Sequence, residues 1–277
     1  MPDLGFDETI RAALREDMPD GDVTSDSIIP PAAVSEAVLL AREAGVLAGL
    51  PVCRRVFEIV DGRVSFQAKS EDGLTFRSGD ILARLKGPSA SLLKGERTAL
   101  NFLQRLSGIA TATRRFVDAV AGTKAKILDT RKTTPGLRLL EKYAVRMGGG
   151  QNHRLSLSDM ALIKDNHLRH VGSITEAVRR ARENVRPGLR VEVEVTSFEE
   201  SQEALAAGAD IVMLDNMALE EMKRVVDSYA GRIPIEVSGN VTLERAGEIA
   251  ALGVDFISVG ALTHSSRALD ISLEFLS

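Results

Sequence analysis

Residues 190–215 read RVEVEVTSFEESQEALAAGADIVMLD and decide the fold. Two short apolar runs, 190–195 and 210–214, flank a segment, 197–207, whose apolar residues recur at helical spacing. A strand, a helix and a second strand in that order form a crossover between two parallel strands. Gly208 supplies the left-handed backbone that ends the helix. The stretch therefore predicts an α/β fold built on a parallel sheet.

The same alternation extends outward from this unit over the last 150 residues. Strands are predicted at 126–128, 160–163, 190–195, 210–214, 234–237 and 255–259. Helices are predicted at 137–143, 173–184, 197–207, 219–229 and 243–252. Six strands are fewer than the eight of a closed barrel, so an incomplete barrel and an open wound sheet both fit. The matching turns AAGAD (206–210) and ALGVD (251–255) favour the barrel.

The first hundred residues predict a different, α+β domain. A helix at 6–16 precedes a turn-rich loop at 17–26, and a long helical pattern covers 90–120. Extended runs lie between them, at 34–41, 45–48, 64–68 and 81–86. Gly108 predicts a break in the long helix or a close packing contact. We therefore expect an N-terminal α+β sandwich domain at 1–107, an incomplete parallel α/β barrel at 108–266, and a tail at 267–277 that packs back on the first domain.

Composition excludes several classes of protein. Hydrophobic residues make up 44% of the 277 residues and aromatic ones 4%, which suits helices packed on parallel strands. The one cysteine excludes an intramolecular disulfide and a multi-cysteine metal site. We find no signal peptide and no run of about 18 apolar residues. The expected location is the cytosol, with no membrane contact.

Positive charge is concentrated in one segment. Residues 124–169 hold ten Lys and Arg but four Asp and Glu, a local charge of +6 in a chain whose net charge is −4. Such a segment indicates an anionic ligand, although a solvated charged face explains it equally well. Tyr143 is the one aromatic residue of the segment, so a stacking platform for nucleic acid is not expected.

Polar residues follow each predicted strand, and they sort by type. Cationic side chains come after the first two strands, carboxylates in or after the middle two, and Gly-containing turns after the last two. In α/β barrels the carboxyl ends of the strands carry the chemistry. Gly-rich turns that lead into helices bind phosphate through backbone N–H groups. The pattern predicts a site for a phosphorylated sugar and a second anion.

Other polar residues have a more ordinary interpretation. We expect solvated or packing roles for Lys126, Lys142, His170 and His264. Asp129 is expected to pair with Arg131 or Lys164, and Cys53 to be a small buried residue. For Glu192 an orienting ion pair and a direct role are equally open.

Motifs along the whole chain resemble those of the quinolinate phosphoribosyltransferase family. The two most specific are LDTRKTTPGLR (128–138) and the pair GGGQNHR (148–154) and LIKDNH (162–167). Further matches are EDMPDGDVTSD (16–26), GERTALNFLQRLSGIAT (95–111), VEVEV (191–195), MLDN (213–216), VSGN (237–240) and FISVGALTH (256–264). Asn240 stands where the family often has a second Gly, and Asn tolerates the left-handed backbone that such a turn needs.

The resemblance implies a reaction and a set of roles. Quinolinate would attack 5-phosphoribosyl-1-pyrophosphate, with loss of pyrophosphate and CO₂, to give nicotinate mononucleotide for NAD synthesis. The quinolinate carboxylates would meet Arg131, His153, Arg154 and, from a neighbouring subunit, Arg97. Catalytic roles would fall to Lys132, Lys164, Glu194 and Asp215, the first two between quinolinate and pyrophosphate. The phosphate cup would comprise Ser238, Gly239, Asn240, Gly260 and Ala261.

The resemblance also implies a metal and an assembly. Glu194 and Asp215 would hold the ribose hydroxyls and help place Mg²⁺, directly or through substrate or water. The expected assembly is at least a homodimer, with Arg97 entering the neighbouring subunit's site.

Three alternatives remain at this point. A paralogue associated with molybdate transport would keep the phosphate cup without needing the quinolinate cations, and a non-catalytic binding protein could lack Glu194 or Asp215. An aldolase-type barrel would need a Schiff-base lysine, for which Lys164 is the candidate.

Overall fold

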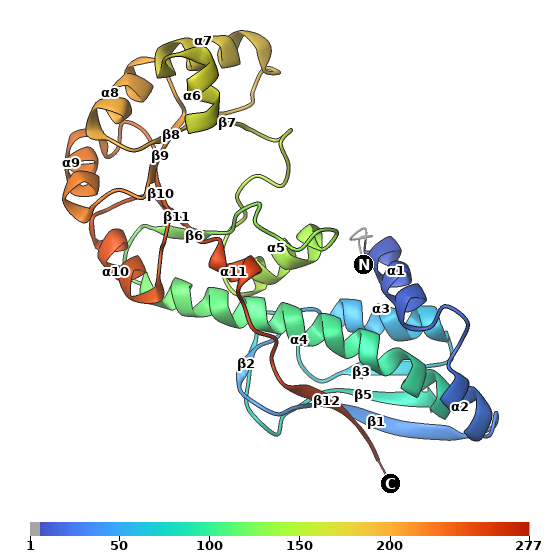
Figure 1. The fold of residues 1–277 in the computed structure, drawn as a ribbon. Coiled ribbons are helices and arrows are strands. Elements are labelled where there is room, and N and C mark those ends of the chain that lie inside the picture. The colour runs from blue at the N-terminus through green and yellow to red at the C-terminus, as the bar shows by residue number, and fades with distance from the viewer. Residues whose placement is uncertain (1–5, 277) are drawn as a thin grey trace. The chain divides into compact units, whose positions relative to one another are not determined.

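The structure is a computed structural model that describes residues 6–276 (Figure 1). The chain divides into two compact units. The amino-terminal unit holds the described residues up to Arg114, Thr133–Gly149 and Leu262 onward. The barrel unit holds Arg115–Lys132 and Gly150–Ala261. Helix α4 (Ser89–Ala119) therefore runs from one unit into the other, and the predicted boundary at 107/108 falls inside this helix.

The barrel unit is built on six parallel strands in the order β6-β11-β10-β9-β8-β7 (Figure 1). Their bounds are β6 Lys126–Leu128, β7 Ala161–Ile163, β8 Val191–Val195, β9 Ile211–Asp215, β10 Ile235–Ser238 and β11 Phe256–Ser258. All six predicted strands are confirmed to within two residues. Consecutive strands from β7 to β11 lie side by side, and the earliest strand, β6, follows β11. This order is that of a barrel rather than of an open sheet wound in two directions.

Helices follow the strands of the barrel unit and cover the outer side of the curved sheet in Figure 1. Their bounds are α6 Asp165–Val171, α7 Ile174–Asn184, α8 Phe198–Ala206, α9 Leu219–Tyr229 and α10 Leu243–Ala251. Four of them confirm predictions. The exception is α6, which the sequence pattern does not predict. It is a short helix with no buried residue, so it lacks the apolar periodicity that marks the others.

Strand alternation separates the two faces of the sheet. Val191, Val193 and Val195 of β8 are fully buried on the side covered by α7 and α8. Glu192 and Glu194 alternate with them and therefore point to the other face, the interior of the barrel. The prediction that these two glutamates share a face is confirmed.

The sheet does not close between β6 and β7. The connection at residues 150–160 runs beside β6 instead, and Gln151 forms a parallel bridge with Leu128. The Gln151 N–H donates to the Ile127 carbonyl at 2.8 Å, and the Asp129 N–H donates to the Gln151 carbonyl at 3.1 Å. A segment without regular secondary structure therefore supplies part of the barrel wall.

The amino-terminal unit has a mixed α+β architecture. A four-stranded antiparallel sheet has the order β12-β1-β5-β3, and β2 pairs with β4. The strands are β1 Val34–Ala41, β2 Gly45–Val46, β3 Ser65–Ala68, β4 Thr75–Phe76, β5 Ile81–Pro88 and β12 Ile271–Phe275. The helices, besides most of α4, are α1 Asp7–Asp17, α2 Val23–Ile28, α3 Leu50–Val60, α5 Arg138–Met147 and most of α11 Ala261–His264.

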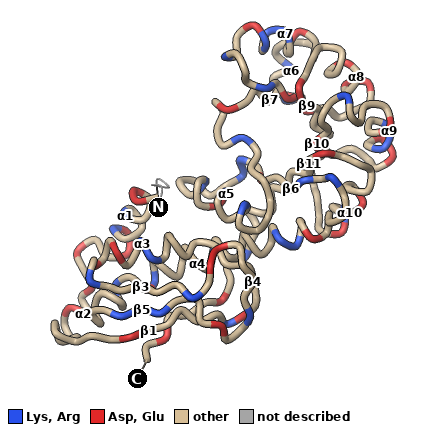
Figure 2. Tube along the Cα trace, turned by 180° about the vertical axis from the view of Figure 1, so that it is seen from behind, with Lys and Arg blue, Asp and Glu red and all other residues tan. Residues whose placement is uncertain are grey.

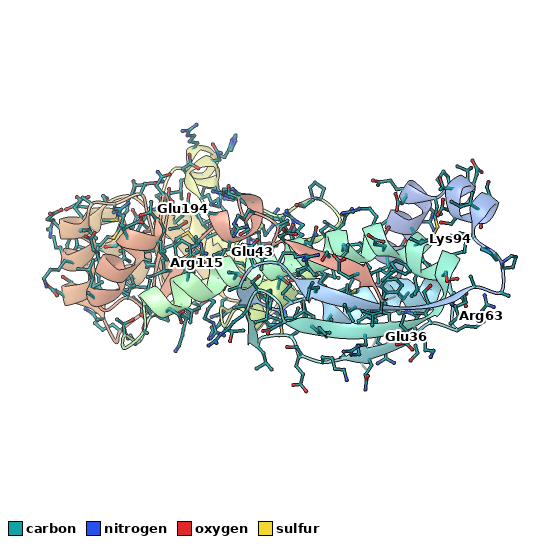
Figure 3. The ribbon with its side chains drawn as sticks, turned by 90° about the horizontal axis from the view of Figure 1, so that it is seen from below. Glu36, Glu43, Arg63, Lys94, Arg115 and Glu194 are labelled. Atoms are coloured by element: carbon teal, nitrogen blue, oxygen red, sulfur yellow. The ribbon has the colours of Figure 1, made fainter. Side chains whose placement is uncertain are left out.

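Two helices of this unit correct the sequence analysis. α2 lies where a loop is predicted, because Asp22 caps it: its Oδ1 accepts from the Thr24 N–H at 3.0 Å and the Ser25 N–H at 3.1 Å. The sequence pattern assigns no helix to α3, which Asp72 caps from a distant turn by accepting from the Leu50 N–H at 3.0 Å. Lys94 of α4, which is labelled in Figure 3, also bonds Asp26 of α2 at 2.6 Å.

Gly108 does not break α4. The alternative prediction, a close packing contact, is confirmed, because a Cβ at Gly108 would lie 1.9 Å from the Arg267 carbonyl oxygen. Lys142 corrects another expectation: its side chain is buried, not solvated. Lys126, His170 and His264 are exposed, and Cys53 is fully buried, as predicted. Among the described helices, none is long and apolar enough to cross a membrane.

Candidate active site

The carboxyl ends of the parallel strands carry most of the predicted site residues. Lys164 follows β7, Glu194 lies in β8, and Asp215 ends β9. Ser238 ends β10, and Gly260 is the second residue after β11. Because the strands are parallel, these ends meet at the same edge of the sheet. The barrel unit therefore gathers cationic, anionic and Gly-containing loops on one edge.

Lys164 and Glu194 form an ion pair across adjacent strands. The Lys164 ammonium donates to Glu194 Oε2, and the backbone N–H of Lys164 donates to His167 Nδ1 at 2.9 Å. The Glu194 side chain is 13% exposed and that of Lys164 is 43% exposed, so the pair lies at the mouth of the barrel. Figure 3 labels Glu194 in the barrel unit. Because both side chains are partly exposed, the ammonium and the carboxylate can each contact a bound ligand.

The turn after β10 has an unusual backbone. Gly239 and Asn240 both have positive φ, 91° and 46°, which confirms that Asn240 adopts the left-handed conformation. Asn216, the residue after β9, also has positive φ, 54°, and its N–H donates to the Ser238 carbonyl at 3.0 Å. Residues other than Gly and Asn rarely take this conformation, so sequence and backbone agree.

Asn216 connects this turn to the carboxylate of β9. Its Oδ1 accepts from Asn240 Nδ2 at 3.0 Å, and its Nδ2 donates to Asp215 Oδ2 at 2.8 Å. A Cβ on Gly239 would lie 2.3 Å from Asn216 Oδ1, so glycine is required at that position. The predicted phosphate turn and the predicted ribose carboxylate therefore belong to one hydrogen-bonded unit, held by a residue outside the predicted set.

The predicted cations lie on two loops of the barrel unit. Arg131 and Lys132 follow β6, and Arg154 lies on the connection to β7, where Figure 2 shows a blue and a red segment. Arg154 Nη1 donates to the Met160 carbonyl at 2.9 Å. Burial lowers the pKa of Arg154, and the nearby positive charge of Arg131 lowers it further, while Glu192 and Asp159 oppose these effects. Two guanidinium groups in a half-buried place repel each other, and an anion between them would relieve that repulsion.

The backbone of the second cationic loop is fixed by Asp129. This carboxylate is fully buried, and its two oxygens accept from the His153 N–H at 2.9 Å and from Asn152 Nδ2 at 2.5 Å. Asp129 therefore ties the loop after β6 to the connection before β7. The sequence analysis did not single out Asn152 as a partner of Asp129, although it stands inside the quoted GGGQNHR motif.

His153 points into the barrel between two buried glutamates. Its Nε2 lies 3.2 Å from Glu192 Oε2 and 3.5 Å from Glu236 Oε1, and Glu192 and Glu236 are 0% and 1% exposed. Burial raises the pKa of Glu236 well above its usual range, and the charge of Glu192 adds to this. The nitrogen and two carboxylates lie within 4.8 Å of one another, which would also suit a metal ion. Glu236 was not predicted, although it is a buried strand carboxylate like Glu192, for which the sequence left a direct role open.

A cavity of about 460 Å³ lies toward the opposite end of the strands. Its walls include Arg190, Ile211 and Phe256, at the amino ends of β8, β9 and β11. His153, Arg154 and Glu236 also line it, so two of the predicted quinolinate residues face this cavity. Lys164, Glu194 and Asp215 lie at the carboxyl ends of their strands.

Arg97 belongs to the amino-terminal unit. It lies on α4, and its side chain is exposed. Ala261, the last predicted cup residue, begins α11 directly after Gly260.

The sequence matches two domain models of one family. The C-terminal domain of quinolinate phosphoribosyl transferase matches residues 109–274, and the N-terminal domain matches residues 22–107. The nicotinate-nucleotide pyrophosphorylase (carboxylating) of Mycobacterium leprae is 46% identical over 99% of both chains. The probable enzyme of the same name from Bacillus subtilis is 45% identical, over 94% of this chain and 89% of its own.

Solved structures agree with the sequence relatives. The crystal structure of NadC from Streptococcus pyogenes is 46% identical, has a TM-score of 0.95, and covers 100% of this chain and 99% of its own. The nicotinate-nucleotide pyrophosphorylase of Francisella tularensis has a TM-score of 0.93 at 40% identity, with 100% and 98% coverage. Sequence, fold and the strand-end residues thus lead to one conclusion: the chain belongs to the quinolinate phosphoribosyltransferase family.

Proposed function

We propose that this protein transfers the phosphoribosyl group of 5-phosphoribosyl-1-pyrophosphate to quinolinate, with release of pyrophosphate and CO₂. The observation that carries the proposal is the half-buried pair of guanidinium groups, Arg131 and Arg154, which lie close enough for the charge of one to lower the pKa of the other. Quinolinate has two carboxylates on adjacent ring atoms. Guanidinium groups bind carboxylates through paired hydrogen bonds, so two of them match a dicarboxylate.

The cationic side chains bind and orient quinolinate. Arg131 and Arg154 contact its carboxylates directly, and His153 belongs to the same loop as Arg154. Arg97 completes the pocket from a neighbouring subunit of a homodimer; its exposed place on α4 supports that role. Lys132 and Lys164 lie between quinolinate and pyrophosphate. Holding both anionic reactants in the reactive orientation lowers the entropic part of the activation barrier.

The phosphoribosyl group lies against the opposite loops. The turn Ser238, Gly239 and Asn240, with Gly260 and Ala261, holds the 5′-phosphate through backbone N–H groups. Glu194 and Asp215 accept hydrogen bonds from the ribose hydroxyls. The Asn216 bonds to both Asp215 and Asn240 support a fixed distance between phosphate and ribose.

The transfer requires no nucleophilic side chain. The quinolinate nitrogen forms a bond to the anomeric carbon while the bond from that carbon to pyrophosphate breaks, and the electron pair leaves with pyrophosphate. Positive charge develops on the ribose, and Glu194 and Asp215 stabilise it. The bond from the ring to the adjacent carboxylate then breaks, CO₂ leaves, and the ring carbon takes a proton from water. The cationic ring nitrogen stabilises the intermediate carbanion.

Glu194 and Asp215 also suit Mg²⁺. Both offer carboxylate oxygens at the same edge of the sheet, the donor type that this ion prefers, and they would hold it directly or through substrate or water. When bound, Mg²⁺ neutralises charge on the departing pyrophosphate.

The ion pair of Lys164 with Glu194 weighs against a Schiff-base aldolase. Such a lysine normally lies in an apolar pocket or beside another cation, which favours the neutral amine. Here a carboxylate holds the ammonium.

Incubation of the purified protein with quinolinate, 5-phosphoribosyl-1-pyrophosphate and Mg²⁺ tests the proposal. We expect pyrophosphate and CO₂ in equal amounts, together with nicotinate mononucleotide. Nicotinate, which lacks the second carboxylate, serves as the control acceptor and should react far more slowly. Folded protein that produces neither pyrophosphate nor CO₂ would reject the function. Pyrophosphate without CO₂ would mean transfer to water or transfer without decarboxylation, and would reject the proposed reaction as well.

A further inference from the structure

Arg105 contacts two segments that are far apart in the sequence. It lies on α4, and Figure 1 shows α5 and α11 beside this helix. Its Nη2 donates to Thr134 Oγ1 at 2.8 Å and to the Thr263 carbonyl at 3.1 Å. All three residues belong to the amino-terminal unit. One guanidinium group therefore holds two separate stretches of the chain.

Glu141 of α5 holds this guanidinium and one of the two stretches at the same time. Its side chain is fully buried, and its Oε1 accepts from Arg105 Nε at 2.9 Å and from Arg105 Nη2 at 2.5 Å. Its Oε2 accepts from the Thr134 N–H at 3.1 Å. Two hydrogen bonds from one guanidinium to a carboxylate fix the relative orientation of the two groups. Thr134 is thus bound through both its backbone and its hydroxyl group.

The two stretches continue directly from parts of the proposed active site. Thr134 is the second residue after Lys132, on the loop that follows β6. Thr263 is the second residue after Ala261, which belongs with Gly260 to the proposed phosphate site. β6 and β11 are neighbours in the sheet. The chain therefore leaves two adjacent strands, passes through two parts of the proposed site, and is tied together by one guanidinium group.

The loop after β6 needs such an anchor, because residues 129–137 form neither a helix nor a strand. Asp129 fixes the first end of this loop by its bonds to the connection before β7. Thr134 fixes the second end through the bonds described above. Arg131 and Lys132 lie between these two fixed points. The place of both cations consequently depends on the bonds made by Thr134.

We propose that Arg105 is a positioning residue for the transfer reaction. With Glu141 as its partner, it fixes the place of Lys132 relative to the turn that follows β11. The inference rests on the proposed function, in which Lys132 lies between quinolinate and pyrophosphate and this turn holds the 5′-phosphate. Arg105 acts through the two loops rather than by contact with a substrate.

Arg105→Lys tests the role with the positive charge retained. A lysine lacks the planar fork, so it cannot hold Glu141 and both loops at once. We expect kcat to fall about tenfold, the effect of losing one hydrogen bond to a charged group, because Lys132 acts when both substrates are bound. The KM values should change by about threefold or less, since Arg154 and the turn after β10 still bind the substrates.

Arg54→Lys is the matched control for this substitution. Arg54 bonds Glu58 of the same helix, α3, at 2.8 Å, so the change again replaces the guanidinium of an ion pair by an ammonium. Neither residue is bonded to Thr134 or Thr263. We expect wild-type kcat and wild-type KM for both substrates.

A double variant separates positioning from stability. Arg105→Met alone leaves the buried Glu141 carboxylate without its guanidinium, so the urea midpoint of unfolding should fall. Replacement of both residues by methionine removes that charge, and the midpoint should rise again. The kcat of the double variant should nevertheless stay about tenfold below wild type or lower, because Thr134 has lost both of its anchors. A purely structural pair predicts that kcat recovers together with stability.

Amide hydrogen exchange tests the same tie without substrate. In Arg105→Lys and in the double variant, residues 130–136 and 260–266 should both exchange faster than in wild type, since one guanidinium holds the two stretches. Arg54→Lys should change neither. An inactive wild-type protein would reject the proposed function by itself, whereas the exchange pattern reports on Arg105 alone.

Three results would overturn the positioning role. The first is an Arg105→Lys variant with wild-type kcat. The second is a double variant whose kcat returns with its urea midpoint. The third is faster exchange confined to one of the two stretches, which would show that Arg105 does not connect them.

Discussion

Gly239→Ala is the most informative single substitution in the phosphate turn. Gly239 has φ 91°, and a Cβ there would lie 2.3 to 2.7 Å from the side-chain atoms of Asn216. Gly208 offers a matched control, since it has φ 82° and nothing within 4 Å of a Cβ. Both substitutions impose the same backbone strain, but only the first displaces a neighbour.

The magnitudes follow from the contacts. A left-handed alanine costs about 1–2 kcal/mol, offset by about 0.4–1 kcal/mol from the reduced freedom of the unfolded chain, so Gly208→Ala should destabilise by about 1 kcal/mol. Gly239→Ala must also move Asn216, whose bonds to Asp215 and Asn240 are 2.8 and 3.0 Å long. At about 1 kcal/mol for each bond, its total reaches about 3 kcal/mol.

Urea unfolding of both variants measures the difference, and calorimetric titration measures the affinity for 5-phosphoribosyl-1-pyrophosphate. We expect Gly239→Ala to be about 2 kcal/mol less stable than Gly208→Ala and to lose most of its affinity for the sugar phosphate. Gly208→Ala should bind it normally. Equal loss of stability in the two variants, with normal binding in both, would refute the argument that glycine is required by Asn216.

Three further predictions concern other parts of the chain. Arg97→Ala and Arg131→Ala variants, each inactive, should recover about one quarter of wild-type activity when unfolded and refolded together, because half the dimers are mixed and each mixed dimer has one intact site; no recovery would contradict the shared pocket. Glu141→Ala should lower the free energy of unfolding in urea by about 3 kcal/mol, since Glu141 is fully buried and accepts from Arg105 at 2.5 Å. Glu58→Ala is the control: Glu58 is only half-buried in its pair with Arg54, so its loss should cost about 0.5 kcal/mol. Bonds from Arg179 and Arg180 lower the pKa of Glu176 to about 2, so Glu176→Gln should be less stable than wild type above pH 4.5, and the gap should close as the pH falls toward 2; a gap that persists at pH 2 would show a different cause.

The barrel was predictable because its signals are local. Each strand is a short apolar run between turns, and each of the helices α7 to α10 repeats apolar residues at helical spacing. The order of the strands then follows from the handedness of the crossovers. The residues at the carboxyl ends of the strands could be named for the same reason, since their position along the chain fixes their edge of the sheet.

What the sequence could not show depends on contacts between distant residues. α3 begins where Asp72 caps it from more than twenty residues away, and no local pattern carries that information. Lys142 belongs to a charged segment but is buried, because burial depends on tertiary packing. Glu236 lies beside His153 of the connection before β7, and Asn216 bonds Asn240 of the turn after β10, so both contacts depend on the folded arrangement.

The sheet has no strand pairing between β6 and β7, so the barrel is weakest on this side. On every other side each strand is held by a continuous ladder, but here two backbone bonds at Gln151 join the wall to β6. Amide exchange at Gln151 and Asp129 should consequently report on the state of the pocket, slowing when a dianion bridges the two loops. An architecture closed by a loop rather than by a strand places Arg131 and Arg154 on the two segments that meet at this side.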